Sequence, residues 1–133
     1  MGHRELGIVN SEKRNARPDI TERTFRFAVR VAKLGRGLNS RDLTTRVMVR
    51  QLLRAGTSIG ANMEEAQTGH SRADFANKCS IACKEARETH YWLRLLAATD
   101  TAPQVQLTDL MIECDELIAV LTAIVKKVKQ PPK

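Results

Sequence analysis

A heptad-like pattern over residues 104–129 is the feature that most constrains the fold of this chain. Its apolar residues recur at alternating intervals of three and four, which places them on one face of an α-helix. They are Leu107, Leu110, Cys114, Leu117, Leu121, Ile124 and Val128. A strand would need alternation at every second residue. The pattern therefore predicts a helix, and Pro131 and Pro132 predict its end.

Three further segments have helical periodicity, and short polar turns separate them. The first spans residues 19–37, where Asp19 and Glu22 have the spacing of a helix N-cap. The second begins near Arg41 and ends near Thr68, and the third begins after Ser71. Its predicted seam is Phe75, Cys79, Ala82, Ala86, Thr89, Leu93 and Leu96. We expect an all-α, antiparallel up-down-up-down four-helix bundle over residues 19–130.

Composition agrees with one helical domain of 133 residues, because 42% of the residues are hydrophobic but only 4% are aromatic. Residues 1–18 are polar and lack periodicity, so we expect a flexible basic arm that either touches nucleic acid or is simply solvated. The three cysteines lie within helical patterns and indicate a reducing compartment. With no signal-peptide core and no membrane-spanning run, the chain is expected to be cytoplasmic, without a membrane partner.

Small and polar residues interrupt the second segment between residues 51 and 65. Ser58, Gly60 and Ala61 stand where an ordinary amphipathic helix would carry bulky side chains. Small residues let another backbone come close. Gly56 and Gly60 also weaken a helix, so the segment predicts either a bend or a close packing contact.

Basic residues form two regular series in a chain of net charge +7. One series occupies a single side of the first predicted helix, and the other recurs at every fourth position of the second. Such stripes could follow a phosphate backbone of RNA or DNA, or could be ordinary solvated faces. The residues are Arg23, Arg26, Arg30 and Lys33, followed by Arg46, Arg50 and Arg54.

A second set of polar residues lies on the middle two predicted helices. It could line a functional surface, or it could be a network of hydrogen bonds and ion pairs between helices or subunits. We favour the structural network, because partly buried polar groups need partners and fix the register of helices. The set is Arg54, Ser58, Asn62, Glu65, Lys84, Glu85 and Glu88.

The residues that could bind a metal or act in catalysis do not form a complete motif in this sequence. A di-iron bundle needs Glu-x-x-His pairs, but Glu85 and Glu88 are followed three residues later by Glu88 and Tyr91. Cys79, Cys83 and His90 could share a helix face, yet they offer at most three ligands. We therefore expect no enzyme activity, no metal and no cofactor.

Apolar positions on the first and last predicted helices cover more of the circumference than one neighbour requires. Met111, Ile118 and Val125 widen the stripe of the last helix. The apolar positions of the first helix are Phe25, Phe27, Ala28, Val29, Val31, Ala32 and Leu34. Large exposed apolar patches are rare on monomers. We expect these faces to pack against another copy of the chain.

Residues 51–96 resemble the signature of a bacterial four-helix bundle family, named for proteins encoded in intervening sequences of large-subunit ribosomal RNA genes. The ordered elements that match are Gln51 and Arg54, Ser58-Ile59 and Asn62, Glu64-Glu65-Ala66, Ser71 with Asp74-Phe75, and Lys84-Glu85 through Glu88 to Trp92-Leu93. The resemblance implies an antiparallel bundle that assembles as a ring, typically a homopentamer, without known catalysis. Relatives include the accessory protein of diversity-generating retroelements, which binds a reverse transcriptase and nucleic acid.

Two functions follow from these observations and from the resemblance. The leading hypothesis is a ring-forming scaffold or accessory protein that binds RNA or DNA through the basic faces of its first two helices. The alternative is an accessory subunit that docks a partner enzyme, such as a reverse transcriptase, without touching nucleic acid. The low aromatic content speaks against stacking on single-stranded bases.

Overall fold

The computed structural model describes residues 19–38 and 41–131, which form four α-helices and, within those ranges, no strand. In chain order the helices are α2 (Ile20–Arg36), α3 (Leu43–Gln67), α4 (Arg72–Ala98) and α5 (Gln104–Lys129). This confirms the prediction of an all-α protein with four helices. The predicted arm at residues 1–18 lies outside the described residues.

Local capping chemistry explains where the helices begin. The carboxylate of Asp19 accepts a hydrogen bond from the Glu22 amide at 3.1 Å, as the sequence predicted. Helix α3 begins at Leu43, two residues later than predicted, because Asp42 is its N-cap. The Asp42 carboxylate accepts hydrogen bonds from the Thr45 hydroxyl at 2.7 Å and the Thr45 amide at 3.0 Å. These bonds stabilise the charged carboxylate and lower the pKa of Asp42.

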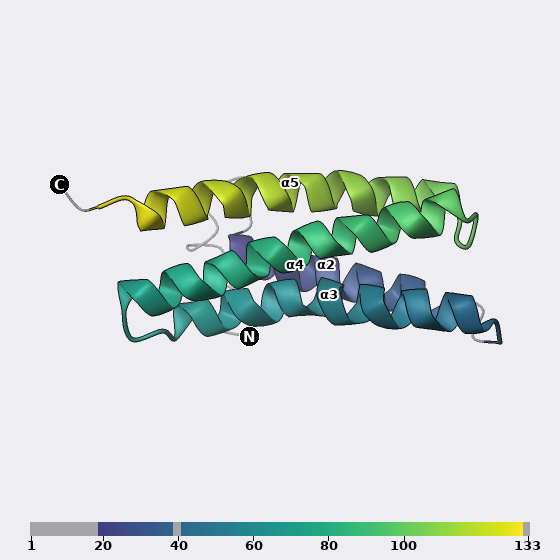
Figure 1. Ribbon diagram of the computed structural model, residues 1–133, viewed down its shortest axis with the longest axis horizontal. Coiled ribbons are helices and arrows are strands. Elements are labelled where there is room, and N and C mark those ends of the chain that lie inside the picture. The colour runs from purple at the N-terminus through teal and green to yellow at the C-terminus, as the bar shows by residue number, and fades with distance from the viewer. Residues whose placement is uncertain (1–18, 39–40, 132–133) are drawn as a thin grey trace, which may run out of the picture.

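Each helix packs on two of the other three (Figure 1). Helix α3 contacts α2 and α4, whereas α5 contacts α4 and, over a smaller area, α2. Neither the pair α2 and α4 nor the pair α3 and α5 is in contact in the described part of the chain. The members of each pair therefore occupy opposite corners, as in a four-helix bundle. The connection from α3 to α4 lies at one end, and the connection from α4 to α5 at the other (Figure 1).

The predicted apolar seams form the core. On α4 every seam residue is buried except Phe75, which is half-buried. On α5 the seam is buried from Leu107 to Leu121, and its last two residues, Ile124 and Val128, are half-buried. The Cys114 thiol lies within this core and donates a hydrogen bond to the Ala86 carbonyl at 3.2 Å.

Helix α3 runs without interruption through both of its glycines and packs closely on α2. A Cβ atom placed on Gly60 would lie 3.2 Å from the Thr24 carbonyl oxygen. A Cβ atom on Gly56 would lie 3.0 Å from Cγ1 of Val31. Of the two alternatives that the glycines suggested, the structure therefore shows the close packing contact.

The C-terminal end of α5 is held by an arginine from α4. Arg72 Nε donates to the Val128 carbonyl at 3.0 Å, and Arg72 Nη2 donates to the Gln130 carbonyl at 3.2 Å. The last carbonyls of a helix have no partner within the helix itself. Arg72 therefore provides hydrogen bonds and a positive charge where the helix dipole favours them.

Several large apolar side chains on the outer faces of α2 and α5 remain exposed. Phe25 is 57% exposed and Val29 is 37% exposed on α2, and Val105 and Ile112 on α5 are 75% and 54% exposed. Phe25 and Val29 belong to the wide apolar face predicted for the first helix. On α5 the residues predicted to widen the face, Met111, Ile118 and Val125, are instead half-buried against the core. None of the described helices is both long enough and apolar enough to span a membrane.

Candidate nucleic-acid interface and polar network

The predicted basic stripe of α2 begins with an ion pair across the bundle. Arg23 Nε and Nη2 donate to the two carboxylate oxygens of Glu113 on α5, each at 2.7 Å. Arg23 Nη2 also donates to Glu116 at 2.6 Å. These bonds, of which those to Glu113 have the largest effect, raise the pKa of Arg23 and keep its charge fixed. Arg23 therefore joins α2 to α5 and can reach a phosphate only by giving up these carboxylates.

The rest of the α2 stripe is partly neutralised. Arg26 pairs with Glu22 on the same helix at 2.6 Å. Arg30 and Lys33 are exposed, and with Asp109 of α5 they line an open hollow of about 450 Å³ between the two helices. The stripe thus lies on the flank of α2 that faces the acidic side of α5. Only its C-terminal half is exposed without an ion pair in the described part of the chain.

The basic series of α3 contains two exposed cations and one cation that is paired with another helix. Arg46 and Arg50 are exposed on the outside of the helix. Arg54, by contrast, reaches across to two carboxylates of α4. Two of the seven predicted cations, Arg23 and Arg54, are therefore paired with carboxylates of other helices.

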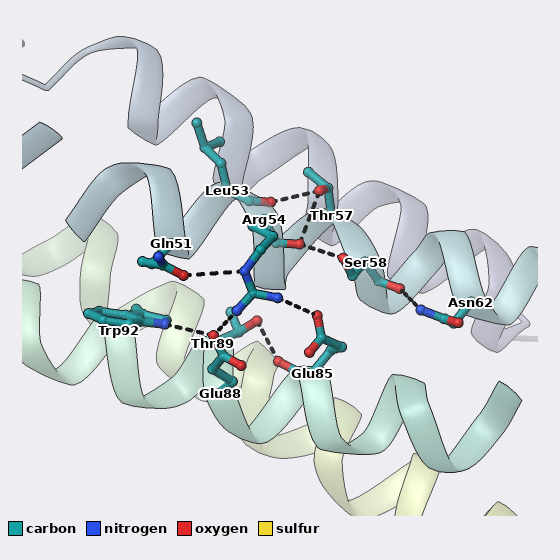
Figure 2. Close-up of polar contacts among 10 residues, drawn as sticks. All are labelled: Gln51, Leu53, Arg54, Thr57, Ser58, Asn62, Glu85, Glu88, Thr89 and Trp92. Carbon is teal, nitrogen blue, oxygen red and sulfur yellow. Dashed lines mark hydrogen bonds and ion pairs between the residues drawn. The ribbon is translucent and has the colours of Figure 1, made fainter. Parts of the chain in front are cut away.

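Arg54 is the centre of a polar cluster between α3 and α4 (Figure 2). Its Nη1 donates to Glu85 Oε2 at 3.1 Å, its Nη2 donates to Glu88 Oε2, and its Nε donates to Gln51 Oε1 at 3.2 Å. Glu88 Oε2 also accepts a hydrogen bond from Trp92 Nε1 at 3.1 Å. Because Glu85 is only 9% exposed, its charge depends on Arg54 for compensation. The cluster joins the two helices at a fixed register.

The other members of the predicted network lie elsewhere. Ser58 Oγ donates to the Arg54 carbonyl at 2.6 Å, and Asn62 Nδ2 donates to the Ser58 carbonyl at 2.8 Å, so both bonds stay within α3. Glu65 pairs with Lys78 at 3.2 Å. Lys84 is exposed and makes no hydrogen bond or ion pair with another described residue.

Sequence reasoning missed two residues of the Arg54 cluster, Gln51 and Trp92. Gln51 lies three residues before Arg54, and Trp92 lies four residues after Glu88, so each pair shares a helix face. That spacing was the signal that could have found them. Their side chains complete the hydrogen bonds of a cluster whose centre was predicted.

All three cysteines are buried and free. Burial raises the pKa of the Cys114 thiol to about 12, and the nearby charges of Asp115 and Glu113 add to the effect. Burial also raises the pKa of the Cys79 thiol. Within residues 19–38 and 41–131 no three His, Cys, Asp or Glu side chains are grouped so that they could hold a metal ion.

Comparison with known proteins identifies relatives of this bundle. The sequence model of the family described as 23S rRNA-intervening sequence protein matches residues 17–123. A similar solved structure is the crystal structure of a protein of unknown function from the S23 ribosomal protein family, from Bacteroides thetaiotaomicron. It has 41% sequence identity and a TM-score of 0.74, and the match covers 80% of this chain and 98% of that one. No curated protein matches the chain.

The family match includes α2, α3 and α4 completely and most of α5. It also contains the whole Arg54 cluster and the ion pairs of Arg23. The chain therefore belongs to the 23S rRNA-intervening sequence protein family.

Proposed function

We propose that this protein is a non-enzymatic, cytoplasmic scaffold or accessory protein, a bundle of antiparallel helices that self-assembles and binds nucleic acid through phosphates. The observation that carries the proposal is the surplus of exposed cations in a chain of net charge +7. Arg30, Lys33 and Arg50 all remain exposed after the bundle has formed. Such cations attract a polyanion and release its counterions on binding.

Self-assembly is supported by the exposed apolar side chains on two different helices. Phe25 and Val29 lie one turn apart on α2, and Val105 and Ile112 lie two turns apart on α5. Contact between the α2 patch of one copy and the α5 patch of the next would be a heterologous interface. Interfaces of this kind close into rings when the rotation between copies allows it. We propose such a ring, and the resemblance to the family suggests a pentamer.

The nucleic-acid part is tested with the purified protein and a short fluorescent RNA. Fluorescence anisotropy is measured from low to physiological salt, for the wild type and for a triple variant with Arg30→Gln, Lys33→Gln and Arg50→Gln. We expect binding that weakens steeply with salt and a smaller salt dependence for the variant. The absence of binding by the wild type at low salt would contradict the proposal.

Assembly is tested by multi-angle light scattering at micromolar concentration. We expect a multiple of the 14.9 kDa chain mass for the wild type. The double variant Phe25→Ser and Ile112→Ser should dissociate, since it removes an apolar side chain from each proposed contact. A wild-type monomer would contradict the assembly and leave RNA binding to be judged separately.

A second candidate function is the docking of a partner enzyme, and a specific observation favours it. Leu43 and Val47 are 64% and 50% exposed, one turn apart at the beginning of α3. Apolar side chains on this helix are separate from the α2 and α5 patches and would suit a protein partner. Substitution of both by Ser should then abolish capture of the partner from a native lysate without changing the mass of the assembly. Unchanged capture would contradict a docking role for this patch.

A further inference from the structure

Helix α4 carries a row of cations that neither predicted basic series includes. Lys84, Arg87 and Arg94 are all exposed, and none makes a hydrogen bond or ion pair with another described residue. Tyr91 falls between them, so the four follow the spacing i, i+3, i+7 and i+10 that keeps residues on one side of a helix. At 1.5 Å per residue the row is about 15 Å long. We call these four residues the α4 track.

The carboxylates close to the α4 track, one on α4 itself and one on the neighbouring helix α5, already have partners. Glu88 is bound by Arg54 and by the Trp92 indole (Figure 2). Asp115 of α5 pairs with His90 at 3.1 Å. The three cations of the track therefore stay uncompensated, in contrast to Arg23 on α2.

Tyr91 is an aromatic ring held in place within this charged row. Its side chain is 51% exposed, and its ring packs edge-on against Trp92, with ring centroids 5.1 Å apart and planes at 80°. The Trp92 ring that supports Tyr91 is itself fixed, because its indole N–H donates to the Glu88 carboxylate, which also accepts a hydrogen bond from Arg54. The Arg54 cluster thus braces a half-exposed aromatic ring.

A hollow of about 470 Å³ opens beside this ring, between α4 and α5. Apart from Tyr91 and Arg94, its lining is apolar and consists of Leu95, Ala97, Ala98 and Met111. The volume lies within the range of sites for small organic groups. One aromatic side chain, one guanidinium and an apolar floor suit a flat ring that is linked to an anion.

We propose that the α4 track is a binding site for single-stranded nucleic acid, in which Tyr91 stacks on one base beside the hollow and Lys84, Arg87 and Arg94 contact phosphates. The proposal rests on the proposed nucleic-acid function and names its surface and ligand. A single strand combines regularly spaced negative charge with exposed aromatic rings, whereas a duplex hides its bases in the stack. The low aromatic content of the chain limits stacking to about one base per track.

The experiment compares two sets of cations on different parts of the bundle. Anisotropy is measured with a short fluorescent single-stranded RNA and with the same strand in a duplex. One triple variant carries Lys84→Gln, Arg87→Gln and Arg94→Gln. The matched control carries Lys126→Gln, Lys127→Gln and Lys129→Gln, which also removes three exposed charges but none from α4 and none from the cations of the proposed function. Circular dichroism confirms that each variant folds.

We expect the α4 triple variant to lose at least tenfold in single-strand affinity, and its salt dependence to fall by about two counterions, since each phosphate contact contributes roughly 0.7. Tyr91→Leu should weaken single-strand binding about tenfold and leave duplex binding unchanged, while Tyr91→Phe should bind as the wild type does. Single-strand binding by the α4 triple variant equal to that of the wild type would overturn the inference.

The remaining outcomes separate this inference from the proposed function. If only the control variant loses binding, the α4 track is not the site, but the proposed function stands. If the wild type binds neither form of RNA, the proposed function and the inference both fail. If polyglutamate displaces the RNA as well as unlabelled RNA does, the track recognises acidic peptides and the inference is overturned.

Discussion

The backbone of Thr24 passes so close to Gly60 that a Cβ atom on Gly60 would lie 3.2 Å from the Thr24 carbonyl oxygen and 3.3 Å from the carbonyl carbon. Both neighbours are backbone atoms of α2, so they can retreat only if the whole helix moves. This contact sets the distance between α2 and α3.

Gly60→Ala should therefore destabilise the protein in spite of the better helix propensity of alanine. Overpacking costs about 1–3 kcal/mol, whereas the propensity gain is about 1 kcal/mol, so the free energy of unfolding should fall by up to about 2 kcal/mol. Urea denaturation followed by circular dichroism measures it. Gly37→Ala is the control, because its Cβ would meet nothing nearer than 3.6 Å. A more stable Gly60→Ala protein would show that α2 is free to shift.

Arg54→Ala should cost about 1–2 kcal/mol in the free energy of unfolding, because Glu85 would keep a nearly buried charge without its partner. Glu85→Gln in the same chain should restore part of the loss, and a double-mutant cycle in urea measures the coupling. Arg50→Ala is the control, since this exposed side chain should change stability by less than about 0.5 kcal/mol. A coupling of zero would mean that the ion pair contributes nothing to the bundle.

Arg23→Gln should lower the free energy of unfolding by about 1 kcal/mol at low salt, and by less in about 1 M salt, where charges are screened. The reason is that Arg23 and Glu113 are each only about one-fifth exposed, at 23% and 20% of their side chains. Arg26→Gln breaks an exposed pair, with 61% and 49% exposure, and should change little. If both substitutions changed the free energy of unfolding equally, the pairing of Arg23 with α5 would contribute no more than an exposed ion pair.

Cysteine alkylation should report the burial of the thiols. The pKa of the Cys114 thiol is about 12, above the usual value of 9.0, so this thiol stays protonated and unreactive at pH 8. Iodoacetamide at pH 8 should therefore modify Cys114 only after unfolding in urea, as mass spectrometry would detect. The same shift makes stability fall between about pH 9 and pH 12, where the unfolded chain loses this proton first. Rapid labelling of Cys114 in the native protein would contradict its burial.

The four helices and their core could be predicted because their signals are local. The N-caps Asp19 and Ser71 lie within three residues of the amides that they bind, and the seam of α5 repeats within one segment. The sequence also marked Gly60 as the site of either a bend or a close contact, and the structure shows the contact. Such features require no knowledge of which helix lies opposite.

The charged residues were harder to assign, because spacing shows which helix face a residue occupies but not what lies across from it. Arg23 and Glu113 are 90 positions apart, so their pairing depends on the arrangement of α2 and α5. For the same reason Lys78, and not Lys84, pairs with Glu65. The α4 track was not predicted, because the sequence placed Lys84 in the polar network with Glu85 and Glu88.

The contacts of Arg72 with the end of α5 also have a consequence for the synthesis of the chain. Its guanidinium binds a carbonyl that lies 56 positions further along the chain, and another at Gln130. During synthesis on the ribosome, α4 is therefore complete long before the residues that Arg72 must bind exist. These hydrogen bonds cannot form before residues 128–130 have been added, so a nascent chain that stops before residue 128 lacks both of them.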